Sequence, residues 1–315
     1  MCRRLELHPS KSLGQNFVVD PGTVCRIVKL ADAGPHVIEV GPGLGSLTLA
    51  LLAAGHHVTA IELDPVLAAQ LPLTVAGRAA GLADRLTVVT ANALDVTELP
   101  ASPNPTTTPS SPTNSRETEL SHTPTQARET ELWHNPAALV ANLPYNVAVP
   151  LLLTYLERFD FITKALVMVQ AEVAARLVAK PGSRTYGVPS AKLAWWGTAR
   201  LAGQVPRNVF YPVPRVDSSL VLFQRWGPTD EPHSSLSELG HLKAAQYPAV
   251  ARVIDAAFAQ RRKTLRSALS GLAGSKEAAE AALIKAKVEP SQRGEQLAAP
   301  DFARIAGALG LMEAP

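Results

Sequence analysis

The stretch Glu39-Val40-Gly41-Pro42-Gly43-Leu44-Gly45 decides the fold. It ends a β-branched run that begins at His36, and it precedes a helical pattern over 47–54. Glycines between a strand and a helix let the backbone turn tightly and approach a ligand closely at the helix N-terminus. The motif therefore predicts a nucleotide-like ligand. Taken alone, it is compatible with NAD, with another adenosine-containing cofactor, or with a turn that needs glycine for packing.

Strand-like runs alternate with helical patterns on both sides of this loop. The strand-like runs are 36–40, 58–61, 86–89, 138–140, 165–169 and 219–223, and the helical patterns are 47–54, 65–75, 149–159 and 172–178. This alternation predicts an α/β fold with a parallel sheet covered by helices. After Trp226 a polar stretch precedes helical periodicity over 248–312. We therefore expect two domains, 1–226 and a helical 227–315.

Residues 100–136 interrupt the α/β pattern and are rich in Pro, Thr, Ser and Asn. The segment contains a near-tandem repeat of twelve residues, in which Arg-Glu-Thr-Glu-Leu begins at 116 and again at 128. Such a composition buries too little apolar surface to offset the entropy of ordering. Because long loop insertions cost little stability, we interpret the segment as a mobile surface expansion rather than as a dedicated binding element.

Composition limits the classes of protein. Hydrophobic residues make up 46% and charged residues 18% of the 315-residue chain, as in folded globular proteins, and the net charge of +3 is too small to argue for a nucleic-acid partner. Neither Cys2 nor Cys25 belongs to a pattern with disulfide or metal-ligand spacing. No stretch approaches the roughly 20 apolar residues of a membrane span. We expect a cytoplasmic protein without a metal.

Two side chains after the next strands narrow the choice of cofactor. Glu62 stands at the end of the second strand, where a carboxylate can accept hydrogen bonds from both ribose hydroxyls of an adenosine. Without the glycine motif, it would be read as a solvated strand-end acid. Asn92 follows the third strand, where methyltransferases usually place an Asp that accepts from the cofactor's adenine amino group. The carbonyl of Asn92 offers the same acceptor.

The string Asn142-Leu143-Pro144-Tyr145 follows the fourth strand. An adenine amino nitrogen is a poor nucleophile because its lone pair is delocalised, and acceptors around its hydrogens draw it toward tetrahedral geometry. We expect the Asn142 side-chain oxygen and the Leu143 carbonyl to be these acceptors, with Pro144 turning that carbonyl outward. Tyr145 offers a ring for stacking an unpaired base. The alternative is a simple strand-ending turn.

Seven ordered strings resemble the KsgA/RsmA family of small-subunit rRNA adenine dimethyltransferases, which is related to the Erm and mitochondrial transcription factor B methyltransferases. They are Leu13-Gly14-Gln15-Asn16-Phe17, Glu39 to Gly45, Ile61-Glu62-Leu63-Asp64, Asn142 to Tyr145, Tyr186-Gly187, Phe210 to Ser218, and Phe258 to Arg266. The resemblance covers nearly all of the chain except 100–136. It implies a Rossmann-like, seven-stranded sheet that binds S-adenosylmethionine, and a small helical C-terminal domain.

The resemblance also implies roles for individual residues. The residues that would line the cofactor pocket are Gln15, Asn16, Val18, Glu39, Gly41, Gly43, Gly45, Glu62, Asn92 and Asn142. Phe210 would give a second aromatic face, opposite Tyr145, for the target adenine, although an isolated Phe is more often part of a core. Asn92 departs from the family's usual Asp, which puts the contact to the cofactor's adenine in question.

A basic run falls on a predicted helix whose apolar stripe contains Ile254, Phe258, Leu265 and Leu269. Its members are Arg261, Arg262, Lys263 and Arg266. Four cations within six residues suit phosphate contacts, and they also suit a solvated helix face. The resemblance favours contact with RNA.

The function implied by the resemblance is methyl transfer from S-adenosylmethionine to the N6 amino groups of two adjacent adenosines. These lie in the 3'-terminal hairpin loop of 16S rRNA in the immature small subunit, and the enzyme is expected to act as a monomer. An Erm-like enzyme of 23S rRNA, a non-catalytic ribosome-assembly factor and, more distantly, a NAD oxidoreductase are alternatives. The last leaves Asn142 to Tyr145 unexplained.

Overall fold

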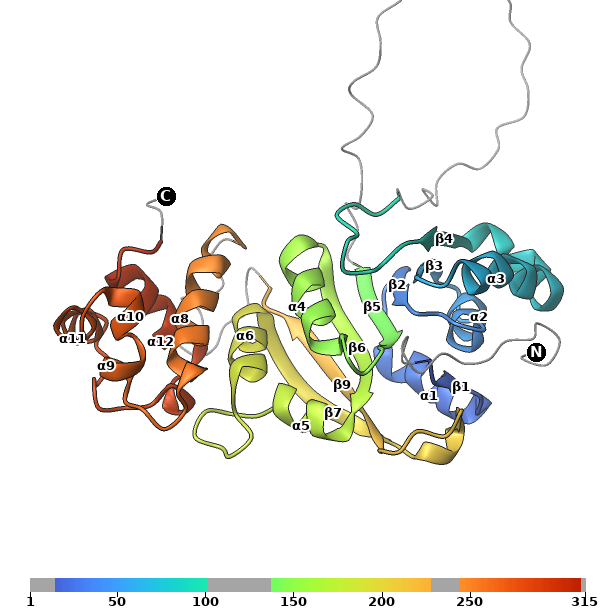
Figure 1. The fold of residues 1–315 in the computed structure, drawn as a ribbon. Coiled ribbons are helices and arrows are strands. Elements are labelled where there is room, and N and C mark those ends of the chain that lie inside the picture. Colours follow the sequence, from blue (N-terminus) through green and yellow to red (C-terminus); the bar gives the residue numbers. More distant parts are fainter. Residues whose placement is uncertain (1–14, 101–136, 228–243, 313–315) are drawn as a thin grey trace, which may run out of the picture.

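The computed structural model describes residues 15–100, 137–227 and 244–312 (Figure 1). Apart from its first residue, the segment 100–136 lies outside these ranges, as do the predicted repeat and Cys2. No helix in the described ranges is long and apolar enough to span a bilayer.

One seven-stranded sheet forms the centre of the molecule, with the strand order β4-β3-β2-β5-β6-β9-β7. Its strands are β2 (His36–Val40), β3 (His57–Glu62), β4 (Leu86–Thr90), β5 (Ala137–Asn142), β6 (Ile162–Gln170), β7 (Gly197–Val205) and β9 (Ser218–Arg225). Neighbours from β4 to β6 pair parallel. The last strand predicted, β9, is antiparallel to both β6 and β7. The expected α/β fold with a Rossmann-like seven-stranded sheet is confirmed, with this antiparallel end added.

Both faces of the sheet are covered, which explains why the central strands β2, β3 and β5 are buried along nearly their whole length, whereas the outer strands β4 and β7 are partly exposed. The covering helices are α1 (Pro21–Ala31), α2 (Ser46–Ala53), α3 (Pro65–Arg78), α4 (Ala148–Arg158), α5 (Ala171–Leu177) and α6 (Val188–Trp196). Since neighbouring residues of a strand point to opposite faces, Val37 and Val140 join one apolar cluster, whereas Ile38 and Leu139 join the other. Burial of both layers fixes the register of the central strands.

Two aspartates fix the first residues of helices α1 and α3. Asp20 caps α1 by accepting a hydrogen bond from the Thr23 N–H at 2.6 Å, and Asp64 caps α3 by accepting from the Val66 N–H at 2.9 Å. Each Asp is followed by a proline at the first helical position, where a backbone N–H would have no hydrogen-bond partner within the helix. The chain therefore turns from strand into helix at a fixed residue.

The strand order reverses next to β2. The chain runs outward from β2 through β3 to β4, returns across the sheet, and then runs from β5 to β6 on the other side. Ligands of open α/β sheets bind outside the carboxyl ends of the strands at such a switch point. This location brings the ends of β2, β3 and β5 together.

A two-stranded sheet lies beside this edge. It pairs β1 (Phe17–Val18) antiparallel with β8 (Phe210–Tyr211), and the Val19 N–H donates to the Val209 carbonyl next to it. The sequence patterns did not predict this pair, nor did they predict α1, α6 or β7. Two-residue strands and a short helix between strands carry little periodicity.

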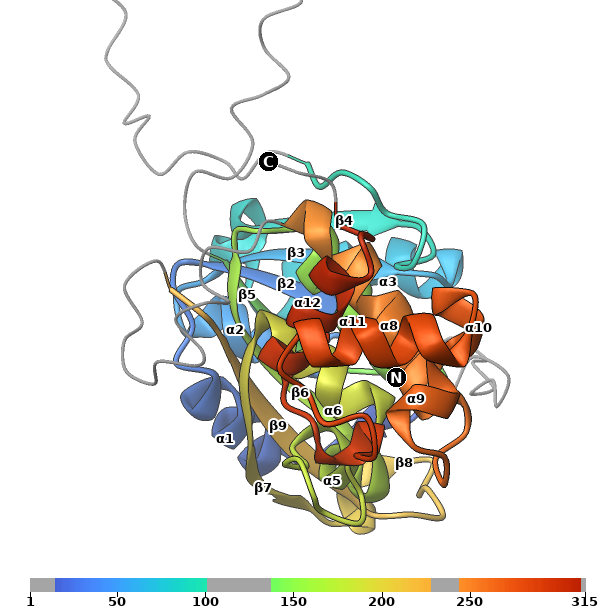
Figure 2. The same ribbon diagram turned by 90° about the vertical axis from the view of Figure 1, so that its left-hand side faces the viewer.

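The C-terminal helices pack against one end of the sheet domain (Figures 1 and 2). They are α8 (Tyr247–Ala259), α9 (Leu265–Ala268), α10 (Ser270–Ala273), α11 (Lys276–Lys285) and α12 (Ala299–Ala308), with short 3-10 helices at Ala244–Gln246 and Gly294–Gln296. Two further 3-10 helices, Ala80–Arg85 and Arg207–Val209, belong to the sheet domain. Trp196 of α6 contacts Tyr247 of α8 with tilted rings whose centroids are 4.8 Å apart, and the Tyr186 hydroxyl donates to the Leu297 carbonyl at 2.9 Å. A helical C-terminal region is confirmed, and one apolar cluster joins it to the sheet. The boundary at 226/227 stays a prediction.

Candidate active site

The glycine loop joins β2 to α2 at the switch point. Gly41, Gly43 and Gly45 have φ values of +69°, +57° and +84°, in the left-handed region that favours glycine. A methyl group on Gly43 would come within 2.7 Å of the Phe17 ring. These φ values explain the spacing of the motif, because each glycine turns the backbone where a side chain would be strained.

Gly45 is not among the residues that line the pocket, and its predicted cofactor contact stays a prediction. It precedes α2 as the capping residue, and a methyl group here would come within 2.6 Å of Leu71 Cδ1. The third glycine of the motif therefore leaves room for the Leu71 side chain of α3. This is a packing role, which a turn motif alone does not distinguish from ligand binding.

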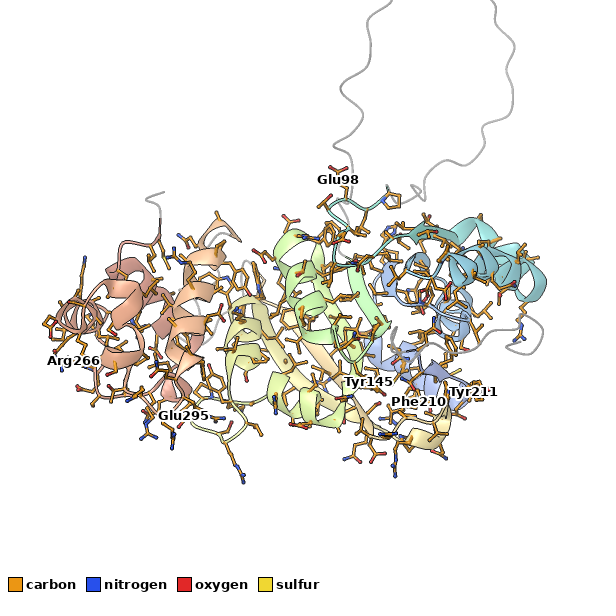
Figure 3. The ribbon with its side chains drawn as sticks, in the orientation of Figure 1. Glu98, Tyr145, Phe210, Tyr211, Arg266 and Glu295 are labelled. Atoms are coloured by element: carbon orange, nitrogen blue, oxygen red, sulfur yellow. The ribbon has the colours of Figure 1, made fainter. Side chains whose placement is uncertain are left out.

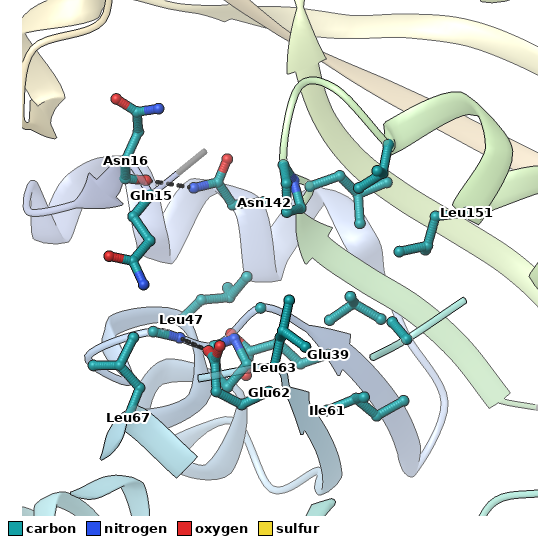
Figure 4. Close-up of a pocket in the computed structure, with 18 of the residues that line it drawn as sticks. Gln15, Asn16, Glu39, Leu47, Ile61, Glu62, Leu63, Leu67, Asn142 and Leu151 are labelled. Carbon is teal, nitrogen blue, oxygen red and sulfur yellow. Dashed lines mark hydrogen bonds between the residues drawn. The ribbon is translucent and has the colours of Figure 1, made fainter. Parts of the chain in front are cut away.

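Glu62 ends β3 and projects toward the glycine loop (Figure 4). One carboxylate oxygen accepts the Gly43 N–H at 3.0 Å, and the other accepts the Asp64 N–H at 3.0 Å. Burial raises the pKa of this carboxyl, and the two backbone N–H groups oppose that shift. A carboxylate oxygen has two lone pairs, so each oxygen keeps one acceptor position for a ligand hydroxyl.

Glu39 is more deeply buried than Glu62, with 1% of its surface exposed. The Thr48 hydroxyl of α2 donates to one of its oxygens at 2.6 Å. Burial raises the pKa of Glu39 to about 8, Glu62 adds to the rise, and the Thr48 hydrogen bond opposes it. Glu39 lines the pocket, as predicted, as a carboxyl that holds its proton at neutral pH.

Asn92 lies at the rim of the pocket, but its side chain is engaged in the turn after β4. Its Oδ1 accepts the Leu94 N–H at 3.2 Å, and its amide nitrogen donates to Asp95 at 2.9 Å. The oxygen keeps one lone pair. An adenine amino group that makes the predicted contact would therefore donate to the same Oδ1 that accepts the Leu94 N–H.

The segment before β1 crosses the opening of the pocket. Gln15, Asn16 and Val18 all line it, as predicted, together with Phe17. The Gln15 side-chain amide donates to Asp64 at 3.3 Å, and the Asn16 carbonyl accepts from the Asn142 side chain at 2.8 Å (Figure 4). The N-terminal segment is thus tied to the turns after β3 and β5.

The turn after β5 places Asn142, Leu143, Pro144 and Tyr145 on the opposite wall. The amide nitrogen of Asn142 points to the Asn16 carbonyl, which leaves its Oδ1 pointing away from that contact as an acceptor (Figure 4). Leu143 is buried and its N–H donates to the Met168 carbonyl of β6 at 3.2 Å. The turn is held to the neighbouring strand.

The Tyr145 hydroxyl forms a hydrogen bond with the Ser218 hydroxyl at 2.7 Å. Ser218 is the fully buried first residue of β9, and burial raises the pKa of the Tyr145 phenol. Sequence reasoning quoted Ser218 as part of a motif but gave it no role. The position of Ser218 at the end of that motif was the one sign in the sequence that it belongs to the site.

The pocket is lined from four turns that converge at one edge of the sheet. Its lining residues are Gln15 to Val18, Glu39 to Leu44, Ser46, Leu47, Ile61 to Leu63, Leu67, Ala91 to Leu94, Asn142 to Tyr145, Val147 and Leu151. All predicted cofactor residues except Gly45 occur among them. The roles assigned to them remain predictions.

Comparison with known proteins identifies the family. The family model for ribosomal RNA adenine dimethylase matches residues 7–309. The chain belongs to this family. Two relatives named ribosomal RNA small subunit methyltransferase A are similar to it. The one from Kineococcus radiotolerans is 54% identical over 97% of this chain and 88% of its own length, and the one from Thermobifida fusca is 52% identical over 97% and 92%.

Solved structures share the adenine dimethylase fold. A dimethyladenosine transferase from Plasmodium falciparum superposes with a TM-score of 0.65 at 18% identity, covering 92% of this chain and 95% of its own. The 23S rRNA methyltransferase ErmE superposes with a TM-score of 0.57 at 23% identity, covering 93% and 99%. Both similarities extend over the sheet and the C-terminal helices.

Phe210 is not among the residues that line the pocket of this family member. It is 2% exposed, pairs with Val18 in the β1–β8 sheet and belongs to an apolar cluster. The expected open aromatic face is therefore wrong for the described conformation, because a base reaches this ring only if the β8 segment moves. The neighbouring Tyr211 is 51% exposed.

The basic run lies on a turn, contrary to its predicted helix. Helix α8 ends at Ala259, so Arg261, Arg262 and Lys263 follow it, and Arg266 falls on the short helix α9. Arg261 pairs with Glu295 at 2.9 Å, and Arg266 pairs with Glu280 at 2.8 Å and Glu277 at 3.4 Å. Arg262 and Lys263 are exposed and form no ion pair with any described residue, so they carry most of the positive charge that a phosphate would meet.

Proposed function

We propose that this chain transfers methyl groups from S-adenosylmethionine to the N6 amino groups of two adjacent adenosines in the 3'-terminal hairpin loop of 16S rRNA. The reaction takes place on the immature small subunit in the cytoplasm, and the enzyme acts as a monomer. Family membership and the relatives named small subunit methyltransferase A support this proposal. The observation that carries it is Asn142, which lines the same pocket as Glu62 and whose side-chain nitrogen, not its oxygen, is held by the Asn16 carbonyl.

The residues present suit the cofactor. The two oxygens of Glu62 each keep an acceptor position for a ribose hydroxyl, and the left-handed backbone at Gly41 and Gly43 leaves no side chain between the loop and a ligand. Leu63, at the rim, provides an exposed apolar surface for a nucleobase. When bound, S-adenosylmethionine supplies a methyl group on a sulfonium, which is already a good leaving group.

Asn142 and Leu143 act on the target amino group. Their oxygens accept its two N–H bonds, which draws the nitrogen lone pair out of conjugation with the ring. Because Asn142 is fixed by Asn16 and Leu143 by Met168, the acceptors do not have to reorganise during the reaction. Holding the nitrogen at near-attack distance then provides most of the rate enhancement.

Methyl transfer from tritiated S-adenosylmethionine to immature small subunits and, in a parallel reaction, to 23S rRNA tests the proposed reaction. We expect label in two adjacent adenosines of the hairpin loop, and mapping of methylated adenines in rRNA from a strain without this protein should show the same two unmodified. Label only in 23S rRNA would assign the chain to the Erm-like activity. If neither RNA is methylated and rRNA binding is retained, the chain would be assigned to the non-catalytic assembly factors.

Replacing Arg262 and Lys263 together with glutamine should weaken rRNA binding and flatten its dependence on salt. Each phosphate contact contributes a slope of about −0.9 in a plot of log affinity against log salt concentration, or somewhat less on single strands. We expect the double variant to lose between one and two such units in a filter-binding titration. Arg261→Gln is the matched control, since this cation is already paired with Glu295. An unchanged slope would place the RNA surface elsewhere.

Ser218→Ala should lower kcat/KM for methyl transfer by about 5- to 10-fold, the value of one hydrogen bond that holds a side chain in place. The expected cause is a Tyr145 ring that is free to rotate, since its hydroxyl loses the 2.7 Å bond to Ser218. Tyr145→Phe should cause a similar loss, and the double variant should be no worse than either. Additive losses in this cycle would show that the two hydroxyls act separately.

A further inference from the structure

Apolar side chains gather on the surface beside the β1–β8 sheet. Among the described residues nine large hydrophobic side chains are strongly exposed, and four of them lie here. They are Val19, Tyr211, Val213 and Val216, which are 55%, 51%, 65% and 43% exposed. We call these four residues the rim patch. Scattered exposed apolar residues are ordinary, whereas a group with an aromatic member marks a contact surface.

The rim patch adjoins the proposed target-base site. Tyr211 pairs with Phe17, which lines the pocket together with Asn142 and Tyr145. Phe210 is buried against the core, and Ser218 holds the Tyr145 hydroxyl. Residues 211–216, which are exposed except for Pro214, are therefore anchored at both ends. Figure 3 labels Tyr145, Phe210 and Tyr211 in this order from left to right across the sheet domain.

Positive charge accompanies this surface. Arg215 is exposed between Val213 and Val216, and it has no ion-pair partner within the described ranges. Arg207 pairs with Asp217 at 3.2 Å and donates to the Arg215 carbonyl at 3.2 Å, which fixes the backbone under the free guanidinium. An aromatic ring beside an unpaired arginine is the combination that proteins use for the base and the phosphate of single-stranded RNA.

We propose that the rim patch binds an unpaired nucleotide next to the target adenosine, with its base stacked on Tyr211 and its phosphate on Arg215. This inference rests on the proposed function, and it adds a contact for the flanking RNA. A protein partner suits the patch less well, because a standard protein interface takes about 20–30 residues from each side. A stacked flanking nucleotide would orient the hairpin loop without reading its sequence.

Fluorescence of an RNA hairpin with two adjacent loop adenosines tests the proposal. In this probe 2-aminopurine replaces the nucleotide that flanks the adenosines. We expect the wild-type enzyme to quench the probe, and Tyr211→Ala to bind it about 10-fold more weakly without quenching, since stacking is lost. Tyr211→Phe should retain both properties. Tyr211→Leu, which keeps apolar bulk for β8, should lose the quenching.

Two further variants separate charge and surface area from stacking. Arg215→Gln should reduce the salt slope of binding by about one unit. Ile284→Ala removes an apolar side chain on α11 that is 64% exposed, about as much as Val213 of the rim patch. We expect no change in RNA affinity or quenching. Thermal melting and cofactor calorimetry should give wild-type values for Tyr211→Leu and Arg215→Gln, because neither residue lines the pocket.

The outcomes distinguish this inference from the proposed function. Unchanged affinity and quenching in both Tyr211→Ala and Tyr211→Leu would overturn the rim patch while leaving the methyl transfer intact. A wild-type protein that binds no hairpin, or binds it without quenching, would also overturn the inference, whereas a wild-type protein that methylates no immature small subunit would overturn the proposed function itself. A loss of dimer in sedimentation of Tyr211→Ala, with RNA binding unaffected, would assign the patch to a second copy of the chain and would also overturn the inference.

Discussion

Asn142→Ala should lower the rate constant for methyl transfer by roughly 10²- to 10³-fold, the loss typical when one preorganised polar group of a reaction centre is removed. The substitution deletes the oxygen that accepts from the target amino group. It also deletes the amide that donates to the Asn16 carbonyl at 2.8 Å, so the N-terminal wall of the pocket loosens. Single-turnover transfer and cofactor calorimetry should separate the two effects, with cofactor affinity falling much less than the rate.

Asn142→Asp is the matched variant. It keeps an acceptor oxygen near the target amino group, and it loses the donor to Asn16 as alanine does. We therefore expect a rate constant above that of Asn142→Ala, together with a similar loss of cofactor affinity. Near-normal turnover in the alanine variant would refute the role of Asn142 in catalysis. Equal rates in both variants would mean that the contact to Asn16 is the whole of its contribution.

The cofactor side of the pocket could be predicted because its determinants are local. Left-handed turns after β2 need glycine, and Glu62 needs only to end the adjacent parallel strand to reach Gly43. Pairing of β2 with β3 over five residues places these positions at one level of the sheet. The spacing of these residues in the sequence was therefore enough to predict that the glycine loop and Glu62 lie together. Gly45 is the exception, since its neighbour Leu71 comes from another helix.

The substrate side depends on contacts between distant segments. Phe210 and Tyr211 point to opposite faces of β8, and only the pairing with β1 decides that Phe210 is the buried one. The hydrogen bond between Ser218 and Tyr145 likewise joins β9 to the turn after β5. A string of residues shows which side chains are adjacent in sequence, and it does not show which face meets the core.

The prediction that the basic run lies on one helix was wrong for a similar reason. Apolar spacing from Ile254 to Leu269 suits one helix, but the chain leaves α8 after Ala259 and the Leu265 N–H donates to the Gln292 carbonyl. Tertiary contacts of this kind override local helical propensity. The acidic partners of Arg261 and Arg266 also come from later helices and turns, so the charge available to RNA could not be counted from the run alone.

The apo protein should lose stability as pH rises from 5 to 8, and Glu39→Gln should remove the part of that loss that comes from Glu39, leaving the part from Glu62, whose pKa burial also raises. The folded pKa of Glu39 is about 8 because burial disfavours the carboxylate, whereas the unfolded chain releases this proton near 4.5. The folded state therefore binds more protons in this window. The stabilisation is complete below the unfolded pKa and disappears as pH passes the folded one. Linkage gives up to about 1.4 kcal/mol per pH unit, so a total near 3 kcal/mol is expected.

Urea unfolding of the cofactor-free protein at pH 5, 6.5 and 8 measures this difference, since a bound ligand would add its own stabilisation. The amide of Glu39→Gln still accepts from Thr48 and has no charge to bury, so the variant should match the wild type at pH 5 and exceed it at pH 8. Glu98→Gln changes an exposed carboxyl and should leave the wild-type pH dependence unchanged. Parallel pH profiles for Glu39→Gln and the wild type would mean that water reaches Glu39. In that case the pocket floor would already hold a carboxylate at neutral pH.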